Sequence, residues 1–335
     1  MKRRWIAAKR LRYQKRRQAY EAARRAEYLK WLRHKRRAAQ GRPKEKLLAS
    51  GERVLKGPVI FSMTRNPDGM NRFLEELLRE RDRGHTVFVD LSEIKDLTFD
   101  AIAVLLARIS EKRFRVGGVR GNEPSDPDLR EMLIASGFYG HIQRSIGVDQ
   151  AGQRGEMIRE GGLKAEGAVA RQLIQRAKCG PESHLEVYRI LVDSMNNTFD
   201  HATPSGGRLG QSPVRWWASA YNSRTGGRGH FAFVDNGIGV LESLNVRGVR
   251  LLARSIGLHD DHSLLRAVFD GKIASRTDLP NRGHGLPGIK GVAERGVVKN
   301  VIVITNGVVA DLSRGDYRKL AYPFGGTLLT WEVES

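Results

Sequence analysis

The chain has 335 residues, of which 40% are hydrophobic, and carries a formal net charge of +21 at pH 7. This length is enough for two domains with a sizeable core, and the single cysteine, Cys179, excludes a disulfide framework and is typical of a reducing, cytoplasmic compartment. No apolar run approaches the roughly 18 residues of a membrane-spanning helix, so we expect no membrane span.

Most of the positive charge lies in residues 1–46. Nineteen lysines and arginines stand there against three acidic residues, a net charge of about +16. Because no proline or glycine precedes Gly41, the segment is predicted to form a long basic helical arm. It lacks the broad apolar face of a membrane-binding helix, so we expect it to bind nucleic acid, RNA or DNA, through its phosphates. A partner-protein surface and the absence of any specific role are the alternatives.

Residues 54–142 show strands alternating with helices. The apolar periodicity predicts strands at 59–63, 86–91 and 114–119, and helices at 71–83, 99–109 and 128–135. Such alternation predicts a small α/β layer structure. Residues 143–180, which are polar and carry several glycines, are predicted to be a linker with one short helix.

Three blocks of this region resemble STAS domains, the fold of anti-anti-sigma factors: residues 87–92 (VFVDLS), 96–101 (DLTFDA) and 133–138 (LIASGF). In STAS domains, a serine at the start of the helix after the second block receives phosphate from a partner kinase. Phe99 or Asp100 occupies that place here, and Thr98 is the neighbouring hydroxyl. Asp100 could mimic a permanently charged state, but an ordinary helix-capping role is the favoured interpretation.

Three further blocks follow in order within residues 181–335. In residues 193–202 (DSMNNTFDHA), Asp193, Asn197 and His201 recur every four residues. A helix would project them from one face, where they could hold a metal ion and a triphosphate. An amide oxygen and phosphate oxygens are ligands that Mg²⁺ accepts.

The second block, residues 235–239 (DNGIG), follows an apolar run and is predicted to end a strand. The Asp235 carboxylate only accepts hydrogen bonds, so it would take the amino N–H of adenine and repel the carbonyl oxygen of guanine. The third block, residues 283–286 (GHGL), precedes a helical pattern, and N–H groups at a helix start bind phosphate. Each block alone has an ordinary alternative, namely a turn, a polar helix face or a loop.

Together the blocks resemble the GHKL group of ATP-binding domains, the Bergerat fold of histidine kinases and gyrase B, and the first block is most similar to that of the anti-sigma serine kinases. The resemblance implies a two-layer α/β sandwich that binds ATP and Mg²⁺. It also implies roles for individual residues: Asp193, Asn197 and His201 as the first box, with Asn197 holding Mg²⁺; Asp235 reading adenine; Gly237 and Gly239 letting the base approach; Gly283, Gly285 and Leu286 on the phosphate side; and Thr327 supporting Asp235.

Many members of that group have glutamate where this chain has Asp193, and that glutamate is their general base. The shorter side chain withdraws the carboxylate by about one bond length, and a misplacement of about 1 Å can cost roughly a hundredfold in rate. ATP binding is therefore the better supported expectation. The sequence predicts an ATP- and Mg²⁺-binding regulatory switch with a basic arm. The alternative is a serine/threonine protein kinase or ATPase that acts on a STAS or sigma-factor-like partner.

Overall fold

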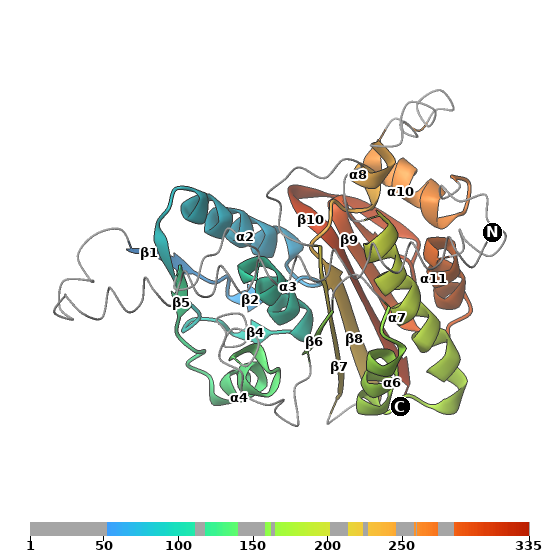
Figure 1. Ribbon diagram of the computed structural model, residues 1–335, viewed down its shortest axis with the longest axis horizontal. Helices are drawn as coiled ribbons and strands as arrows, with labels where there is room; N and C mark the ends of the chain where they lie inside the picture. The colour runs from blue at the N-terminus through green and yellow to red at the C-terminus, as the bar shows by residue number, and fades with distance from the viewer. Residues whose placement is uncertain are drawn as a thin grey trace, which may run out of the picture. The chain divides into compact units, whose positions relative to one another are not determined.

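Five antiparallel strands form the central sheet of the computed structural model (Figure 1). The structure describes residues 52–110, 118–139, 158–161, 165–201, 214–223, 227–245, 258, 260–273 and 285–334, without the side chains of residues 199–201 and 245. The strands stand in the order β6-β7-β8-β10-β9, with the bounds β6 Ile158–Gly161, β7 Trp216–Asn222, β8 Arg228–Asp235, β9 Lys299–Asp311 and β10 Asp316–Glu334.

One face of this sheet is covered by helices (Figure 1). They are α6 Gly167–Ala177, α7 Pro181–His201, α8 Val240–Asn245, α10 Asp261–Phe269 and α11 Gly285–Glu294. Because side chains alternate along a strand, Phe231 and Phe233 of β8 both reach this face. The Phe231 ring stacks on that of Trp331, with centroids 5.0 Å apart, and helix residues such as Leu191 complete the core.

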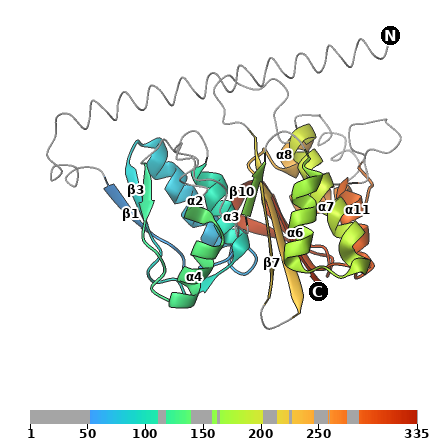
Figure 2. The same ribbon diagram turned by 60° about the horizontal axis from the view of Figure 1, so that its bottom comes forward.

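The opposite face is covered by residues 52–110 and 118–139, which we call the N-terminal α/β layer (Figures 1 and 2). Its small sheet has the order β1-β3-β5, and β2 pairs with β4 beside it. The elements are β1 Glu52–Lys56, β2 Ile60–Phe61, α2 Pro67–Asp82, β3 Thr86–Asp90, β4 Asp96–Leu97, α3 Phe99–Ile109, β5 Val119–Gly121 and α4 Pro127–Ala135. Helix α3 is buried along nearly its whole length and packs against Trp217 and Val234 of the large sheet.

The α/β class is confirmed, but the two-layer description of the C-terminal part is incomplete. Ala232 and Val234 of β8 point away from the helical face and belong to the core that the sheet shares with α3. The large sheet is therefore a middle layer with both faces buried. Arg53–Ser335 forms one compact unit, in which the N-terminal α/β layer and the large sheet share this core.

The segment predicted as a linker, residues 143–180, contributes to the sheet and to its core. Strand β6 pairs antiparallel with β7, with Ile158 opposite Ser219. Helix α6 buries Leu173 and Ile174 in the core of the helical face. Helix α6 corresponds to the short helix predicted in this segment, whereas strand β6 was not predicted, because only two of its four residues, Ile158 and Gly161, are buried.

Other element boundaries differ by a few residues. The predicted helix at 99–109 coincides with α3. Helix α2 begins at Pro67, four residues earlier than predicted, because the Asn66 side chain accepts the N–H of Gly69 (3.2 Å) and proline suits the first helical position. The strand predicted at 114–119 is described only from residue 118 onward, where β5 begins at Val119.

The basic arm, residues 1–46, lies outside the described residues. Among the helices that the structure does describe, none combines the length and the apolar character needed to cross a membrane.

Asp100 sits at the start of α3 and is buried. Its carboxylate accepts the N–H groups of Met63 (3.0 Å) and Thr64 (3.1 Å), which ties the loop after β2 to this helix, and burial raises its pKa. Thr98 is the residue that precedes the helix, but its side chain makes no capping hydrogen bond. A buried carboxylate cannot present a charge to a partner, so the mimicry of a phosphorylated residue has no support here.

Candidate functional site

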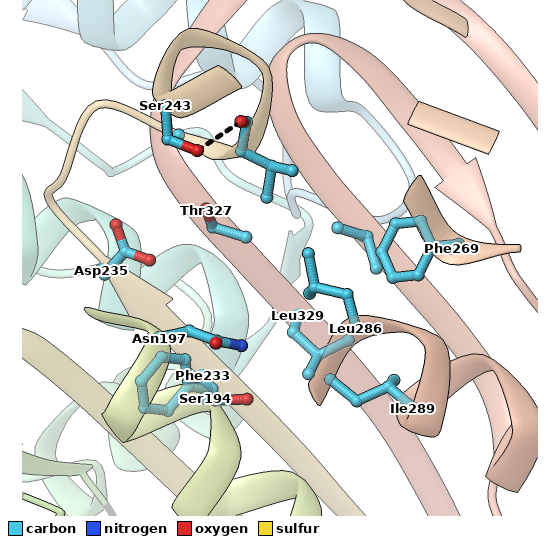
Figure 3. A pocket seen from close by; sticks show the side chains of 13 residues that line it. Ser194, Asn197, Phe233, Asp235, Ser243, Phe269, Leu286, Ile289, Thr327 and Leu329 are labelled. Atoms are coloured by element: carbon cyan, nitrogen blue, oxygen red, sulfur yellow. Dashed lines mark hydrogen bonds between the residues drawn. The ribbon is translucent and has the colours of Figure 1, made fainter. Parts of the chain in front are cut away.

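A cavity opens on the helical face of the large sheet, at the end of β8 (Figure 3). It holds about 610 Å³ of space, part of which is open solvent. Its walls come from α7, β8, the turn into α8, α10, α11, β9 and β10. The lining residues are Ser194, Asn197, Phe233, Asp235, Gly239, Val240, Ser243, Phe269, Leu286, Ile289, Val303, Thr327 and Leu329.

Asp235 and Asn197, from different elements, line this one cavity. In Figure 3, Asp235, Thr327 and Asn197 lie along one side, and Leu286 of α11 lies across from them. The apolar run before Asp235 forms strand β8, as predicted, and the residue ends that strand.

The Asp235 carboxylate is buried and well supplied with donors. The N–H of Gly237 donates to its Oδ1 (2.8 Å), and Thr327, directly opposite on β10, contributes its N–H and hydroxyl. Burial raises the pKa of Asp235 to about 6, against the lowering effect of these hydrogen bonds and of the positive charge of Arg108. The carboxylate is therefore ionised at neutral pH but strongly desolvated, which suits an acceptor for a ligand N–H group.

Two glycines beside Asp235 are required by backbone geometry. Gly326 has φ +94°, and a Cβ there would lie 2.1 Å from the Asp235 carbonyl oxygen. Gly239 has φ +81°, and a Cβ there would lie 2.5 Å from Oδ1 of Asn306. Any larger residue would displace the strand end or the turn that shapes the cavity.

Asn197 lies on α7, and the predicted helix is confirmed over Pro181–His201. Next to it, a Cβ at Gly285 would lie 3.2 Å from Asn197 Nδ2, so the start of α11 closely approaches this side chain. Asp193, one turn earlier, is half-buried and is absent from the described lining, where Ser194 takes part instead. Burial raises the pKa of Asp193, and the positive charge of Arg189 opposes this shift.

Two predicted residues cannot be placed in the cavity. Gly283 lies outside the described residues, as does the side chain of His201. Leu286, by contrast, lines the cavity, and Gly285 opens helix α11 beside it.

Two supporting residues on β9 were not predicted. The Thr305 hydroxyl accepts the N–H of Val240 and donates to the Gly326 carbonyl, both at 3.0 Å. The Asn306 side chain accepts the N–H of Leu241 (3.0 Å) and donates to the carbonyl of residue 238 (2.9 Å). Together they fix the start of α8 to the sheet. The sequence Asn306-Gly307 is typical of a turn, so the pattern of residues did not indicate that Asn306 lies inside strand β9.

The residues at the cavity suit a Mg²⁺ ion that arrives with a ligand. Within the described ranges, no group of three or more histidine, cysteine, aspartate or glutamate side chains could hold a metal ion. The Asn197 amide oxygen could supply a single ligand, and Mg²⁺ usually takes only one or two protein ligands together with phosphate oxygens and water. Asp260, which is followed by Asp261 and His262, has a structural role, because it caps α10 by accepting the Ser263 N–H (2.7 Å).

No protein-family model and no curated protein matches the sequence. Among the solved structures that match is the mycobacterial sensor histidine kinase MprB, with 14% sequence identity. The match covers 45% of this chain and 70% of the kinase chain, with a TM-score of 0.22.

Proposed function

We propose that this chain is a regulatory protein that binds ATP with Mg²⁺ in the cavity at the end of β8 and changes its contacts according to the bound nucleotide. The observation that carries the proposal is that Asp235 and Asn197 line one cavity, with Thr327 supporting the Asp235 carboxylate.

The adenine end of the ligand fits the Asp235 side of the cavity. The carboxylate can accept the N–H of the adenine amino group, whereas the carbonyl oxygen of guanine would meet it with two acceptors opposed. The walls around it are apolar, with Phe233, Val303 and Leu329 among the lining residues. A planar, weakly polar base is the part of a nucleotide that such walls favour.

The phosphate end fits the Asn197 side. Asn197 lies beside the start of α11, where N–H groups and the helix dipole favour negative charge. A Mg²⁺ ion held there by the Asn197 oxygen and by phosphate oxygens would neutralise part of the triphosphate charge. Leu286 lines the cavity at the first turn of the same helix.

Binding is favoured over turnover by the position of the acidic groups. Asp235 is the one carboxylate among the described residues that line the cavity. The hydrogen bonds that it accepts from Gly237 and Thr327 hold it as an acceptor for the base. Asp193, the candidate general base, lies one turn from Asn197, outside this lining. A kinase or ATPase would need a base that reaches the terminal phosphate.

The switch would work through residues 240–282, the segment between the second block (residues 235–239) and the third block (residues 283–286). Its described parts, α8 and α10, contribute Ser243 and Phe269 to the cavity, so a ligand there contacts both helices. A shift of α8 and α10 on ATP binding would change the surface offered to a STAS or sigma-factor-like partner, while the basic arm, residues 1–46, holds a nucleic acid.

Thermal unfolding of the full chain with ATP alone and with Mg·ATP tests this function. A ligand present at about one hundred times its dissociation constant stabilises the fold by about 2.7 kcal/mol, so the melting temperature should rise, and more with Mg²⁺. The absence of any rise would remove the proposal. Incubation with labelled ATP then separates the alternatives: label transferred to a protein indicates a kinase, released phosphate indicates an ATPase, and intact ATP indicates a switch.

A further inference from the structure

Strand β10 leaves its regular pairing with β9 just before it reaches the cavity. The register between the two strands shifts twice in residues 319–327. Helix α2 supplies hydrogen-bond partners for this stretch: the Asp68 carboxylate accepts the Ala321 N–H (2.7 Å), and the Asn71 amide donates to the Tyr322 carbonyl (3.0 Å). The N-terminal α/β layer thus holds a part of β10 where its pairing with β9 is irregular.

Arg108 of α3 makes the contact nearest the cavity. Its side chain is buried, its guanidinium donates to the Gly325 carbonyl, and its Cζ lies 5.0 Å from the centre of the Phe324 ring. Two residues beyond Gly325, Thr327 donates to the Asp235 carboxylate. Arg108, which belongs to the N-terminal α/β layer, therefore contacts β10 only two residues before Thr327, the residue that supports Asp235.

Arg108 also acts on Asp235 through its charge. Its positive charge favours the ionised form of the carboxyl group, in opposition to burial. The charged groups on neighbouring elements include Asp193 on α7, which is half-buried, and Arg215 before β7, which is paired with Glu160. Contacts to the backbone and an electrostatic effect thus come from the same guanidinium.

We propose that Arg108 is a positioning residue for the adenine end of the site: by holding Gly325 it keeps the backbone of Gly326 and Thr327 against Asp235, so that the N-terminal α/β layer forms part of nucleotide recognition. This inference rests on the proposed ATP binding. It goes further in assigning to the N-terminal α/β layer a direct effect on the affinity and base selectivity of the cavity.

The test is nucleotide binding by full-length Arg108→Met, measured by calorimetry from pH 5 to pH 8. Methionine can pack on Phe324 but neither donates to Gly325 nor carries charge. We expect ATP affinity at pH 7 to fall by about fivefold or more, the lower end of the usual range for coupled sites. The affinity for adenosine should fall by the same factor, and the preference for ATP over GTP should become smaller. The pH below which binding declines should move upward, because Asp235 then ionises less readily.

Two further variants make the result decisive. Arg108→Lys keeps the charge and should restore the pH dependence. Its ammonium group cannot both donate to the Gly325 carbonyl and stack on the Phe324 ring, so its ATP affinity should stay below that of the wild type. This lower affinity is the test if the methionine variant melts below the assay temperature. Arg81→Met removes another partly buried arginine of the same layer, one that donates to the His85 carbonyl, and should leave binding unchanged. Unchanged affinity and selectivity in both Arg108 variants, together with an unchanged pH dependence in Arg108→Met, would overturn the inference while the wild type still binds ATP. A wild type that binds no ATP would overturn the proposed function as well.

Discussion

Thr327 lies directly opposite Asp235 in the antiparallel pair of β10 and β8, and its hydroxyl donates to the buried Asp235 carboxylate. Replacement by valine keeps the shape of the side chain and removes this donor. Loss of one hydrogen bond of about 1 kcal/mol should weaken ATP binding about fivefold. The matched control is Thr330→Val, which removes a hydroxyl on the opposite face of the same strand. Equal effects of the two substitutions on ATP affinity would contradict the role of Thr327.

The pKa of Asp235 predicts how this residue affects folding. Its folded-state value of about 6 lies above the ordinary 3.8, so between about pH 4 and pH 6 the folded protein binds more protons than the unfolded chain. The contribution of Asp235 to the free energy of unfolding therefore falls as the pH rises through this window, by about 3 kcal/mol in total. Asp235→Asn should remove this dependence.

Urea unfolding of the wild type and of Asp235→Asn at pH 4.5 and pH 7.5 checks this. The variant should gain stability relative to the wild type as the pH rises, although it loses ATP binding. A relative stability that does not change with pH would show that Asp235 is not held as a desolvated carboxylate.

Asn197→Ala should remove the Mg²⁺-dependent part of ATP binding. The amide oxygen is the described cavity ligand that suits the ion, so the affinity of the variant with Mg²⁺ should fall by about tenfold or more, to the value that the wild type shows with a chelator. Asn196, its exposed neighbour on α7, provides the control as Asn196→Ala. If Mg²⁺ still strengthens ATP binding by Asn197→Ala as much as by the wild type, the ion is held elsewhere.

Gly326→Ala should destabilise the protein strongly. It places a Cβ 2.1 Å from the Asp235 carbonyl oxygen at φ +94°, so we expect a loss of about 3 kcal/mol or more in the free energy of unfolding. Gly315→Ala is the control, because Gly315 also has positive φ (+69°) but no atom within 4 Å of the added Cβ. That control should cost only about 1–2 kcal/mol. Similar losses for both variants in urea unfolding would mean that the contact with Asp235 is easily relieved.

Deletion of residues 1–46 should abolish nucleic-acid binding and leave ATP binding intact, since Arg53–Ser335 is a separate compact unit. For the full chain, the logarithm of the affinity for duplex DNA should fall with the logarithm of salt by about 0.9 for each phosphate contact. Filter binding at several salt concentrations measures this slope. If the affinity for DNA does not change with salt, or if binding is retained after the deletion, residues 1–46 are not the part of the chain that binds nucleic acid.

Sequence patterns located those parts of the site whose geometry is local. The strand that ends at Asp235 and the helix that carries Asn197 are present as predicted. They are recoverable because strand ends and helix faces follow from the order of residues a few positions apart. The grouping of Asn197 and Asp235 in one cavity required the resemblance, since local patterns do not bring distant segments together.

The contacts between distant segments were not predictable in this way. Thr305 and Asn306 act through hydrogen bonds to residues more than sixty positions earlier, and Arg108 contacts a residue 217 positions later. One signal of the covered second face was present: Phe231–Val234 is apolar at every position, which is typical of a strand buried on both faces. An alternating pattern would instead have indicated one solvent-facing side.

Recognition of adenine by Asp235 can be measured by calorimetric titration of the full chain and of Asp235→Asn with ATP and with GTP, at pH 7.5 in the presence of Mg²⁺. We expect the wild type to bind ATP and to discriminate against GTP. The folded variant should bind ATP at least a hundredfold more weakly, because the Gly237 and Thr327 donors would hold the oxygen of its amide and its NH2 group would then meet the adenine amino group with two donors opposed. Equal ATP affinity in the two proteins, or equal affinity of the wild type for ATP and GTP, would contradict the recognition of adenine by Asp235.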